Sequence, residues 1–169
     1  REAASFMTRD FTVESKGSIA NQVTSSDVAV EDFLKEQLER LLPGSGFIAE
    51  ESGKEHTGTE YTWIIDPIDG TANYVRDLAR SAVSVGLYRS MEPFIGVTYD
   101  PYRGELFSAR KGAGAVCNGK AVHVSDRDFA HSLFCTSLSC YKKELAHINA
   151  QILEKVYAKC DDFRRFGSA

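Results

Sequence analysis

Between residues 23 and 42, hydrophobic side chains recur every three or four positions, which is the spacing of one face of an α-helix. The members of this face are Val30, Phe33, Leu34, Leu38, Leu41 and Leu42. Thr24 followed by Asp27 fits a capping box at the start, and Pro43-Gly44 is a stop signal at the end. The pattern therefore predicts a helix over residues 23–42.

Short runs in which β-branched and aromatic residues alternate with polar ones are typical of strands, and they recur through the middle of the chain. They predict strands over residues 46–49, 61–65, 83–88, 94–99, 105–109 and 132–137. Asn118-Gly119 predicts a hairpin turn. Residues 52–60 are polar and predict a loop.

Two further helical patterns lie near the ends of the chain. Residues 1–11 resemble the end of a helix, and residues 142–158 carry apolar side chains on one face. A meander of antiparallel strands followed by a strand–helix–strand unit predicts an α+β chain that passes into α/β. We expect an N-terminal α+β domain over 1–128 and the start of a C-terminal α/β domain over 129–169.

Composition narrows the class of protein. The chain has 169 residues, 43% hydrophobic and 26% charged, which suits a globular domain with a buried core. Its net charge is −4, whereas a protein that binds nucleic acid usually presents an excess of basic residues to the phosphates. No apolar run approaches the roughly 18 residues of a membrane span. No C-x-x-C pair occurs, so we expect reduced thiols and a cytoplasmic protein. The cysteines are Cys117, Cys135, Cys140 and Cys160.

The stretch from Trp63 to Thr71 carries the strongest chemical signal. Asp66 and Asp69 stand three apart and would diverge on a continuing strand, but Pro67 favours a turn that ends the strand and brings the two carboxylates together. Converging carboxylates repel each other unless a cation lies between them, and hard oxygen ligands suit Mg²⁺. The carbonyl of Ile68 is a further candidate ligand.

The residues after this acidic pair point to phosphate. Gly70 allows the backbone to approach a ligand closely, and a helix beginning at Gly70-Thr71 would present free N–H groups to a phosphate. Upstream, Glu50-Glu51 at a strand end adds another candidate carboxylate. Each signal also has a plainer interpretation, since acidic pairs commonly lie on the solvated surface and D-P-I-D-G-T also fits an ordinary turn. Asp27 fits both a cap and a site residue.

Taken together, these motifs resemble the inositol monophosphatase family of Mg²⁺-dependent, lithium-sensitive phosphatases. The matching pieces are Phe47 to Ser52, Trp63 to Asn73, and Lys111 to Ala115, and the likeness is collinear from Lys16 to Ala169. The resemblance implies a layered α-β-α sandwich of the sugar phosphatase type, with an antiparallel N-terminal sheet flanked by helices.

The resemblance also implies a role for individual residues. Glu50 would bind metal and orient the attacking water, Thr71 would contact that water, and Asp27 would accept a hydrogen bond from Thr71. The implied metal ligands are Glu50, Asp66, the Ile68 carbonyl and Asp69. The implied substrate-binding residues are Asp69, Gly70, Thr71, Gly167, Ser168 and Ala169, with Lys16 on a loop over the site.

The activity implied is hydrolysis of a phosphate monoester by a metal-activated water, without a phosphoenzyme. It implies two or three Mg²⁺ ions, with Mn²⁺ as a substitute, a small phosphorylated polyol as substrate, and a homodimer that binds neither nucleic acid nor membrane. A 3′(2′),5′-bisphosphate nucleotidase and a fructose-1,6-bisphosphatase are alternatives within the superfamily. Aspartate-nucleophile phosphatases fit less well, since they space their carboxylates two apart rather than three.

One expected element is absent from the sequence. The family carries a Trp-Asp motif that completes the second metal site, and it would lie beyond residue 169. The chain starts at Arg1 without Met and stops after Gly167-Ser168-Ala169, where Ser168 fits a helix cap. We therefore expect it to be part of a longer protein, and an inactive metal-binding fragment is the alternative for the chain alone.

Overall fold

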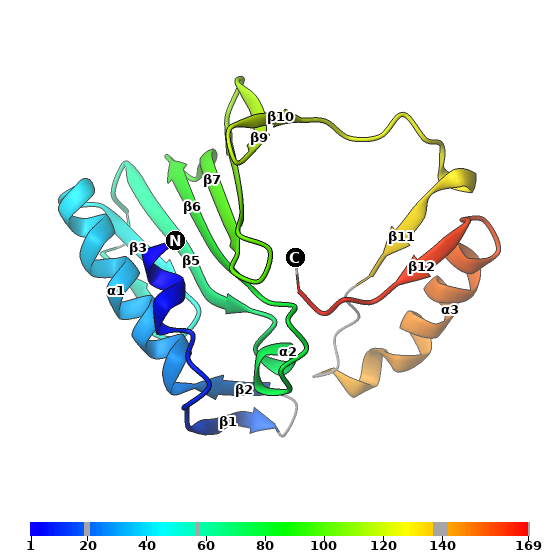
Figure 1. The fold of residues 1–169 in the computed structure, drawn as a ribbon, viewed down its shortest axis with the longest axis horizontal. Coiled ribbons are helices and arrows are strands. Elements are labelled where there is room, and N and C mark those ends of the chain that lie inside the picture. Colours follow the sequence, from blue (N-terminus) through cyan, green and yellow to red (C-terminus); the bar gives the residue numbers. More distant parts are fainter. Residues whose placement is uncertain (19–20, 57, 137–141, 169) are drawn as a thin grey trace.

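The centre of the fold is an eight-stranded mixed sheet in the order β10-β9-β8-β7-β6-β5-β3-β4 (Figure 1). The computed structural model describes residues 1–18, 21–56, 58–136 and 142–168, with the backbone alone for 16–18 and 21. Strands β3 and β5 run parallel and the other neighbours antiparallel. The strands are β3 (Gly46–Ala49), β4 (Gly53–Glu55), β5 (Tyr61–Asp69), β6 (Ala82–Arg89), β7 (Glu92–Asp100), β8 (Glu105–Arg110), β9 (Gly114–Cys117) and β10 (Lys120–Val122). The layered α+β architecture expected from the sequence is confirmed.

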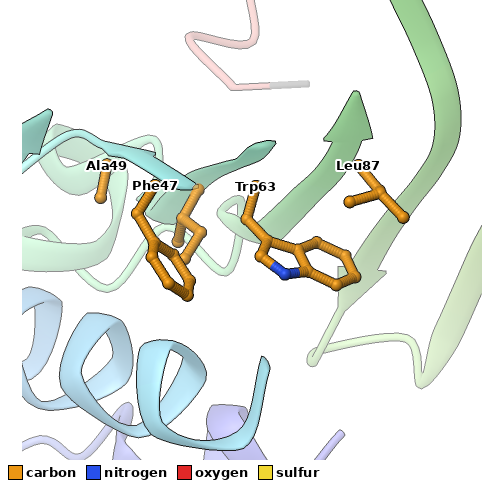
Figure 2. Close-up of a cluster of buried hydrophobic side chains, with 5 residues drawn as sticks. Phe47, Ala49, Trp63 and Leu87 are labelled. Atoms are coloured by element: carbon orange, nitrogen blue, oxygen red, sulfur yellow. The ribbon is translucent and has the colours of Figure 1, made fainter. Parts of the chain in front are cut away.

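Helix α1 (Ser25–Leu41) covers one face of this sheet (Figure 1). The predicted capping box is present, because Thr24 and Asp27 each bond the other's backbone N–H. Burial of the apolar face then holds the helix to β3 and β5, and Figure 2 shows part of the resulting core. The core consists of Phe47, Ala49, Trp63, Ile65 and Leu87, with Leu34, Leu38 and Leu42 of the helix packed against it.

The N-terminal region differs from the sequence prediction. Residues Glu2–Phe6 form a short 3₁₀ helix, η1, that packs against α1, and residues 7–11, which the pattern also predicted to be helical, are not helical. Strands β1 (Val13–Ser18) and β2 (Asn21–Thr24) form an antiparallel ribbon that was not predicted. Strand β4 lies in the segment predicted as a loop. Such short polar strands lack the alternation of apolar and polar residues that predicts a strand. They form because they pair with a neighbouring strand.

Strand β5 contradicts the prediction that it ends at Asp66-Pro67, because it continues through Pro67 to Asp69. Asp66 pairs with Ser84 and Asp69 with Ala82, so three steps along β5 face two steps along β6. This extra residue is a β-bulge. A bulge leaves one residue out of the hydrogen-bond ladder, which makes it a position where proline's missing N–H is tolerated.

The C-terminal region is a separate strand–helix–strand unit, as predicted (Figure 1). Strands β11 (Leu133–Cys135) and β12 (Asp162–Arg164) pair in parallel around η3 (Lys143–Leu145) and α3 (Ala146–Tyr157). Of the strand predicted over residues 132–137, residues 132 and 136 are not part of β11, and residue 137 lies outside the described residues. The domain boundary expected at residue 128, just before η2 (Phe129–His131), stays a prediction. In the described part of the chain, no helix has the length and apolar character to cross a membrane.

Candidate active site

A cavity of about 160 Å³ opens where the end of β5 meets the short helix α2 (Thr71–Val75). Its lining residues are Glu50, Asp66, Ile68, Asp69, Gly70, Thr71, Ala72, Asn73, Arg165 and Gly167. A regular strand would direct side chains three apart to opposite faces, and the bulge adds the one residue that brings them to the same side. The carboxylates of Asp66 and Asp69 therefore converge, by a bulge rather than by the predicted turn.

A larger hollow of about 940 Å³ lies over strands β5 to β9. Its lining is mostly apolar side chains and glycines, although Asp66 also borders it. Size alone does not identify a reactive site, whereas convergent polar groups do. The smaller cavity, which gathers three carboxylates and a hydroxyl, is therefore the candidate active site.

Asp66 is the most perturbed carboxyl group of the cavity. Burial, followed by the negative charges of Glu50 and Asp69, raises its pKa from 3.8 to about 8. Its Oδ1 atom is buried and has no hydrogen-bond partner among the described residues. A buried oxygen without a partner is costly, so its position calls for a ligand that compensates it.

Glu50 approaches the same cavity from β3, the strand parallel to β5. Its N–H donates to the carbonyl of Ile65, 3.1 Å away, which places the residue beside the last part of β5. Among the described residues, no group of three or more His, Cys, Asp and Glu side chains is gathered closely enough to hold a metal ion. Glu50, Asp66 and Asp69 share one cavity, but they do not form a closed ligand set.

Thr71 and Asp27 join the start of α2 to the start of α1. The Thr71 hydroxyl lies 3.3 Å from Asp27 Oδ1 and 3.1 Å from the Ile68 carbonyl, and its single proton can serve either acceptor. Asp27 Oδ2 accepts from the N–H and the hydroxyl of Thr24, at 2.8 and 2.5 Å. Burial raises the pKa of Asp27, and the bonds from Thr24 oppose that rise. Asp27 is thus both the cap of α1 and a partner of Thr71.

The C-terminal segment lies directly on this site. Ser168 Oγ donates to the Asp69 carbonyl at 2.8 Å and lies 3.2 Å from Asp69 Oδ2. Gly70 has a φ of +93°, and a Cβ there would lie 2.8 Å from the Ser168 Cβ. Both the backbone conformation and the close approach therefore require glycine at position 70. The Ser168 hydroxyl is thus bonded to a site residue, and its role as a helix cap stays a prediction.

Asn73 is a site residue that the sequence analysis missed. Its Nδ2 donates to the carbonyls of Arg80 and Phe166, at 2.8 and 2.7 Å. The bond to Phe166 holds the segment before Gly167 against α2, and the bond to Arg80 ties the loop after α2 to the same side chain. Arg165, which lines the cavity, was also missed, although a basic residue beside Gly167 was a usable signal.

Two predicted site residues cannot be placed. The side chain of Lys16 and the whole of Ala169 lie outside the described part of the structure. Of the others, Glu50, Asp66, Ile68, Asp69, Gly70, Thr71 and Gly167 line the cavity, while Asp27 and Ser168 bond residues that line it.

The chain is similar to known proteins along its whole length. It is 36% identical over 170 residues to "Nus factor SuhB" of Salmonella typhimurium strain LT2, a match that covers 99% of this chain and 63% of that protein. It is 35% identical over 158 residues to "Fructose-1,6-bisphosphatase/inositol-1-monophosphatase" of Aquifex aeolicus, covering 93% of this chain and 60% of that protein. The chain thus spans less than two thirds of the length of these relatives.

A solved structure and a family profile agree with these relatives. The structure of extragenic suppressor protein suhB from Bartonella henselae superposes with a TM-score of 0.92 at 29% identity, over 99% of this chain and 67% of that one. The sequence profile of the inositol monophosphatase family matches residues 1–169. The chain therefore belongs to the inositol monophosphatase family.

Proposed function

We propose that this protein hydrolyses phosphate monoesters of small polyols, using water activated by a divalent metal at the cavity between β5 and α2. The observation that carries the proposal is the buried Asp66 Oδ1, which has no hydrogen-bond partner among the described residues. It belongs to a carboxyl whose pKa is raised by burial and further by the neighbouring carboxylates. Family membership supports the reaction class. One relative's printed name joins inositol-1-monophosphatase with fructose-1,6-bisphosphatase.

The chemical type of the donor atoms in the cavity suits a hard cation, although the carboxylates are not gathered into a ligand set in the described structure. Carboxylates of Glu50, Asp66 and Asp69 and the Ile68 carbonyl supply oxygen ligands, which Mg²⁺ prefers and Mn²⁺ also accepts. Burial raises the pKa of Asp66 and repulsion from Glu50 and Asp69 raises it further, and an opposite charge between the acids would remove that repulsion. The site is open on one side, as expected for an ion that keeps some ligand positions for water and phosphate. We propose two or three such ions in the active protein.

The chain's own residues would position the reaction. When bound, Mg²⁺ would lower the pKa of a coordinated water and so make it a better nucleophile. Thr71 would hold that water at its hydroxyl oxygen. As the water gives a proton to Thr71 Oγ1, the original hydroxyl proton of Thr71 would pass to Asp27 Oδ1, 3.3 Å away. The carboxylate of Glu50 would orient the same water from the β3 side of the cavity. Water and phosphate held in line by these groups would react without a phosphoenzyme.

The proposed substrate lies between α2 and the C-terminal segment. The first N–H groups of a helix have no partner within it, so those near Gly70 and Thr71 would hold phosphate. Gly167 and Ser168 border the opposite side, and with Ala169 they would contact the polyol. Lys16 would contribute to the site from the loop that we expect to lie over it. We further propose a cytoplasmic homodimer with two domains that divide near residue 128.

A substrate panel tests this function in the natural polypeptide that carries the sequence. Inositol 1-phosphate, fructose 1,6-bisphosphate and adenosine 3′,5′-bisphosphate are each offered with Mg²⁺ and with a chelator. We expect Mg²⁺-dependent release of phosphate, most rapidly from inositol 1-phosphate, and its loss in Asp69→Asn. Faster release of phosphate from one of the two bisphosphates would instead assign the protein as a fructose-1,6-bisphosphatase or as a bisphosphate nucleotidase. Metal binding without turnover of any substrate would leave only a metal-binding role.

A further inference from the structure

Glu50 lies in a three-residue loop, Glu50–Ser52, that joins the antiparallel strands β3 and β4. Loops of this length are held by few bonds of their own, since the strand ladder ends with the pair Ala49 and Gly53. The loop nevertheless places the side chain of Glu50 at the cavity of the candidate active site. The bonds that fix this loop therefore decide where that carboxylate points.

The main external support of the loop is a buried carboxylate of α1. Glu31 is only 2% exposed, and both of its oxygens accept backbone N–H groups of the loop. Oε2 accepts from Glu51 at 2.8 Å and Oε1 from Ser52 at 2.9 Å. Hydrogen bonds to a charged acceptor are stronger than neutral ones, and here they offset the cost of burying the carboxylate.

These bonds act on the backbone of Glu50 itself. The N–H of Glu50 donates to the Ile65 carbonyl, which fixes the peptide plane before Glu50. The N–H of Glu51 donates to Glu31, which fixes the peptide plane after Glu50. The backbone has only two soft dihedrals per residue, so fixing the planes on both sides sets φ and ψ of Glu50. The direction of its Cα–Cβ bond follows.

Glu31 belongs to a polar stripe on α1 that serves both halves of the site. Asp27, Glu31 and Lys35 are spaced four residues apart and so lie on one side of the helix. Asp27 bonds Thr71 at 3.3 Å, while Lys35 Nζ lies 3.2 Å from Ser52 Oγ. Lys35 also pairs with Glu55 of β4 and lowers the pKa of that carboxyl. One helix thus fixes the geometry of the β3–β4 loop relative to the β5–α2 turn.

We infer that Glu31 is a positioning residue of the active site, which holds Glu50 in the orientation needed to bind the metal. The inference rests on the proposed function for its catalytic consequence, and on the hydrogen bonds alone for its structural one. Glu31 lies outside the lining of the cavity, and it acts through Glu50. The carboxylate is needed as such, because two backbone donors converge on it.

Glu31→Gln tests this role with a small change of shape. An amide offers one acceptor oxygen and one NH₂ group, so one loop N–H would face a donor instead of an acceptor. We expect amide hydrogen exchange to accelerate at least ~10-fold at whichever of Glu51 and Ser52 faces the NH₂ group, because its protecting bond is lost. We expect the Mg²⁺ concentration for half-maximal activity to rise ~10- to 100-fold, the range for residues that orient metal ligands. The substrate KM at saturating Mg²⁺ stays unchanged.

Asp32→Asn is the matched control, since Asp32 is the exposed neighbour on the same helix. It removes one charge from α1 without touching the loop, so we expect wild-type exchange and wild-type Mg²⁺ dependence. If Glu31→Gln does not fold, Glu31→Asp replaces it, because its shortened carboxylate keeps the charge but cannot reach both N–H groups. Calorimetric titration with Mg²⁺ accompanies the kinetics of each variant.

Unchanged exchange at Glu51 and Ser52 in the folded Glu31 variant overturns the inference. So does acceleration that is equal throughout α1, β3 and β5, since that pattern reports a general loss of stability. Unchanged Mg²⁺ affinity with faster exchange overturns its functional part. A wild-type protein that hydrolyses no phosphate monoester refutes the proposed function instead, and the exchange and calorimetric data still decide the role of Glu31.

Discussion

The N-terminal half of α1 and the bulge of β5 both bury carboxyl groups, but the two regions differ in the hydrogen bonds that these groups receive from the protein. Asp27 and Glu31 are 1% and 2% exposed, and each of their four oxygens has a hydrogen-bond donor of the protein within reach. In the bulge, Asp66 Oδ1 is buried without such a partner among the described residues. The carboxylates of α1 therefore hold the site together, while Asp66 is directed to a ligand.

The comparison predicts opposite effects on activity and stability. The largest change in activity is expected for Asp66→Asn, which removes the carboxylate directed to the metal. We expect the turnover rate to fall by roughly three orders of magnitude, because the metal supplies several kcal/mol of transition-state stabilisation. Without metal, the variant melts no lower than wild type near neutral pH, because the amide, unlike the buried carboxyl group, does not have to take up a proton when the protein folds. A clear drop in its melting temperature would show that Asp66 supports the fold.

Asp27→Asn is the counterpart on α1. The substitution weakens the capping box and the bond to Thr71, so we expect the free energy of unfolding to fall by about 0.5–2 kcal/mol. We expect turnover to fall by roughly 10²-fold, the lower end for loss of a proton acceptor. Chemical denaturation and steady-state kinetics measure the two effects. If the Asp27→Asn variant is as stable as wild type, Asp27 does not contribute to the stability of the fold.

The two regions also predict how stability depends on pH. The pKa of Asp66 is about 8 in the folded protein and 3.8 as the ordinary value, so between these values the folded state binds more protons than the unfolded state. Stability of the metal-free protein is therefore greatest near the low end of this window and decreases as pH rises through it. Thermal melts in the presence of a chelator measure the trend. Asp66→Asn should flatten it, and an unchanged slope would assign the trend to other groups.

A smaller effect is expected at the C-terminal segment. Ser168→Ala removes the donor to the Asp69 carbonyl and leaves the backbone free to follow its course. A neutral hydrogen bond contributes about 0.5–1.5 kcal/mol, so we expect a several-fold rise in substrate KM and little change in kcat. Initial-rate kinetics at saturating Mg²⁺ measure both constants. An equal loss in kcat would indicate that Ser168 acts on the reacting groups themselves.

The sequence correctly predicted the elements that are determined by residues close together along the chain. The capping box at Thr24 and the strand over Gly46–Ala49 were predicted at their observed positions. The β-bulge was not, because it arises from pairing between β5 and β6, and the sequence favoured a turn at Pro67. The convergence of Asp66 and Asp69 was nevertheless predicted, although by the wrong backbone device. Because the bulge brings two acids spaced three apart to the same side, their spacing no longer argues against an aspartate-nucleophile phosphatase. Membership of the inositol monophosphatase family is now the reason to prefer the metal-dependent reaction.

Residues that act through hydrogen bonds between distant segments were harder to predict. Glu31 stands in a helix among other charged residues, and nothing local distinguishes it from a solvated position. Its role depends on a loop about twenty residues away, which only the packing of α1 on the sheet brings near. Asn73 is similar, since its partner Phe166 lies 93 residues along the chain. The sequence gives no direct measure of such distances.

The most direct test of the account is calorimetric titration of Mg²⁺ into the natural polypeptide and into its Asp66→Asn variant, in buffers of different ionisation enthalpy. Because Asp66 has a pKa of about 8, Mg²⁺ binding near neutral pH should release a proton from it. We predict a saturable binding isotherm with proton release for wild type, and neither for the variant. Equal Mg²⁺ uptake by both proteins, or none by either, would contradict the claim that the buried Asp66 carboxylate is directed to a metal.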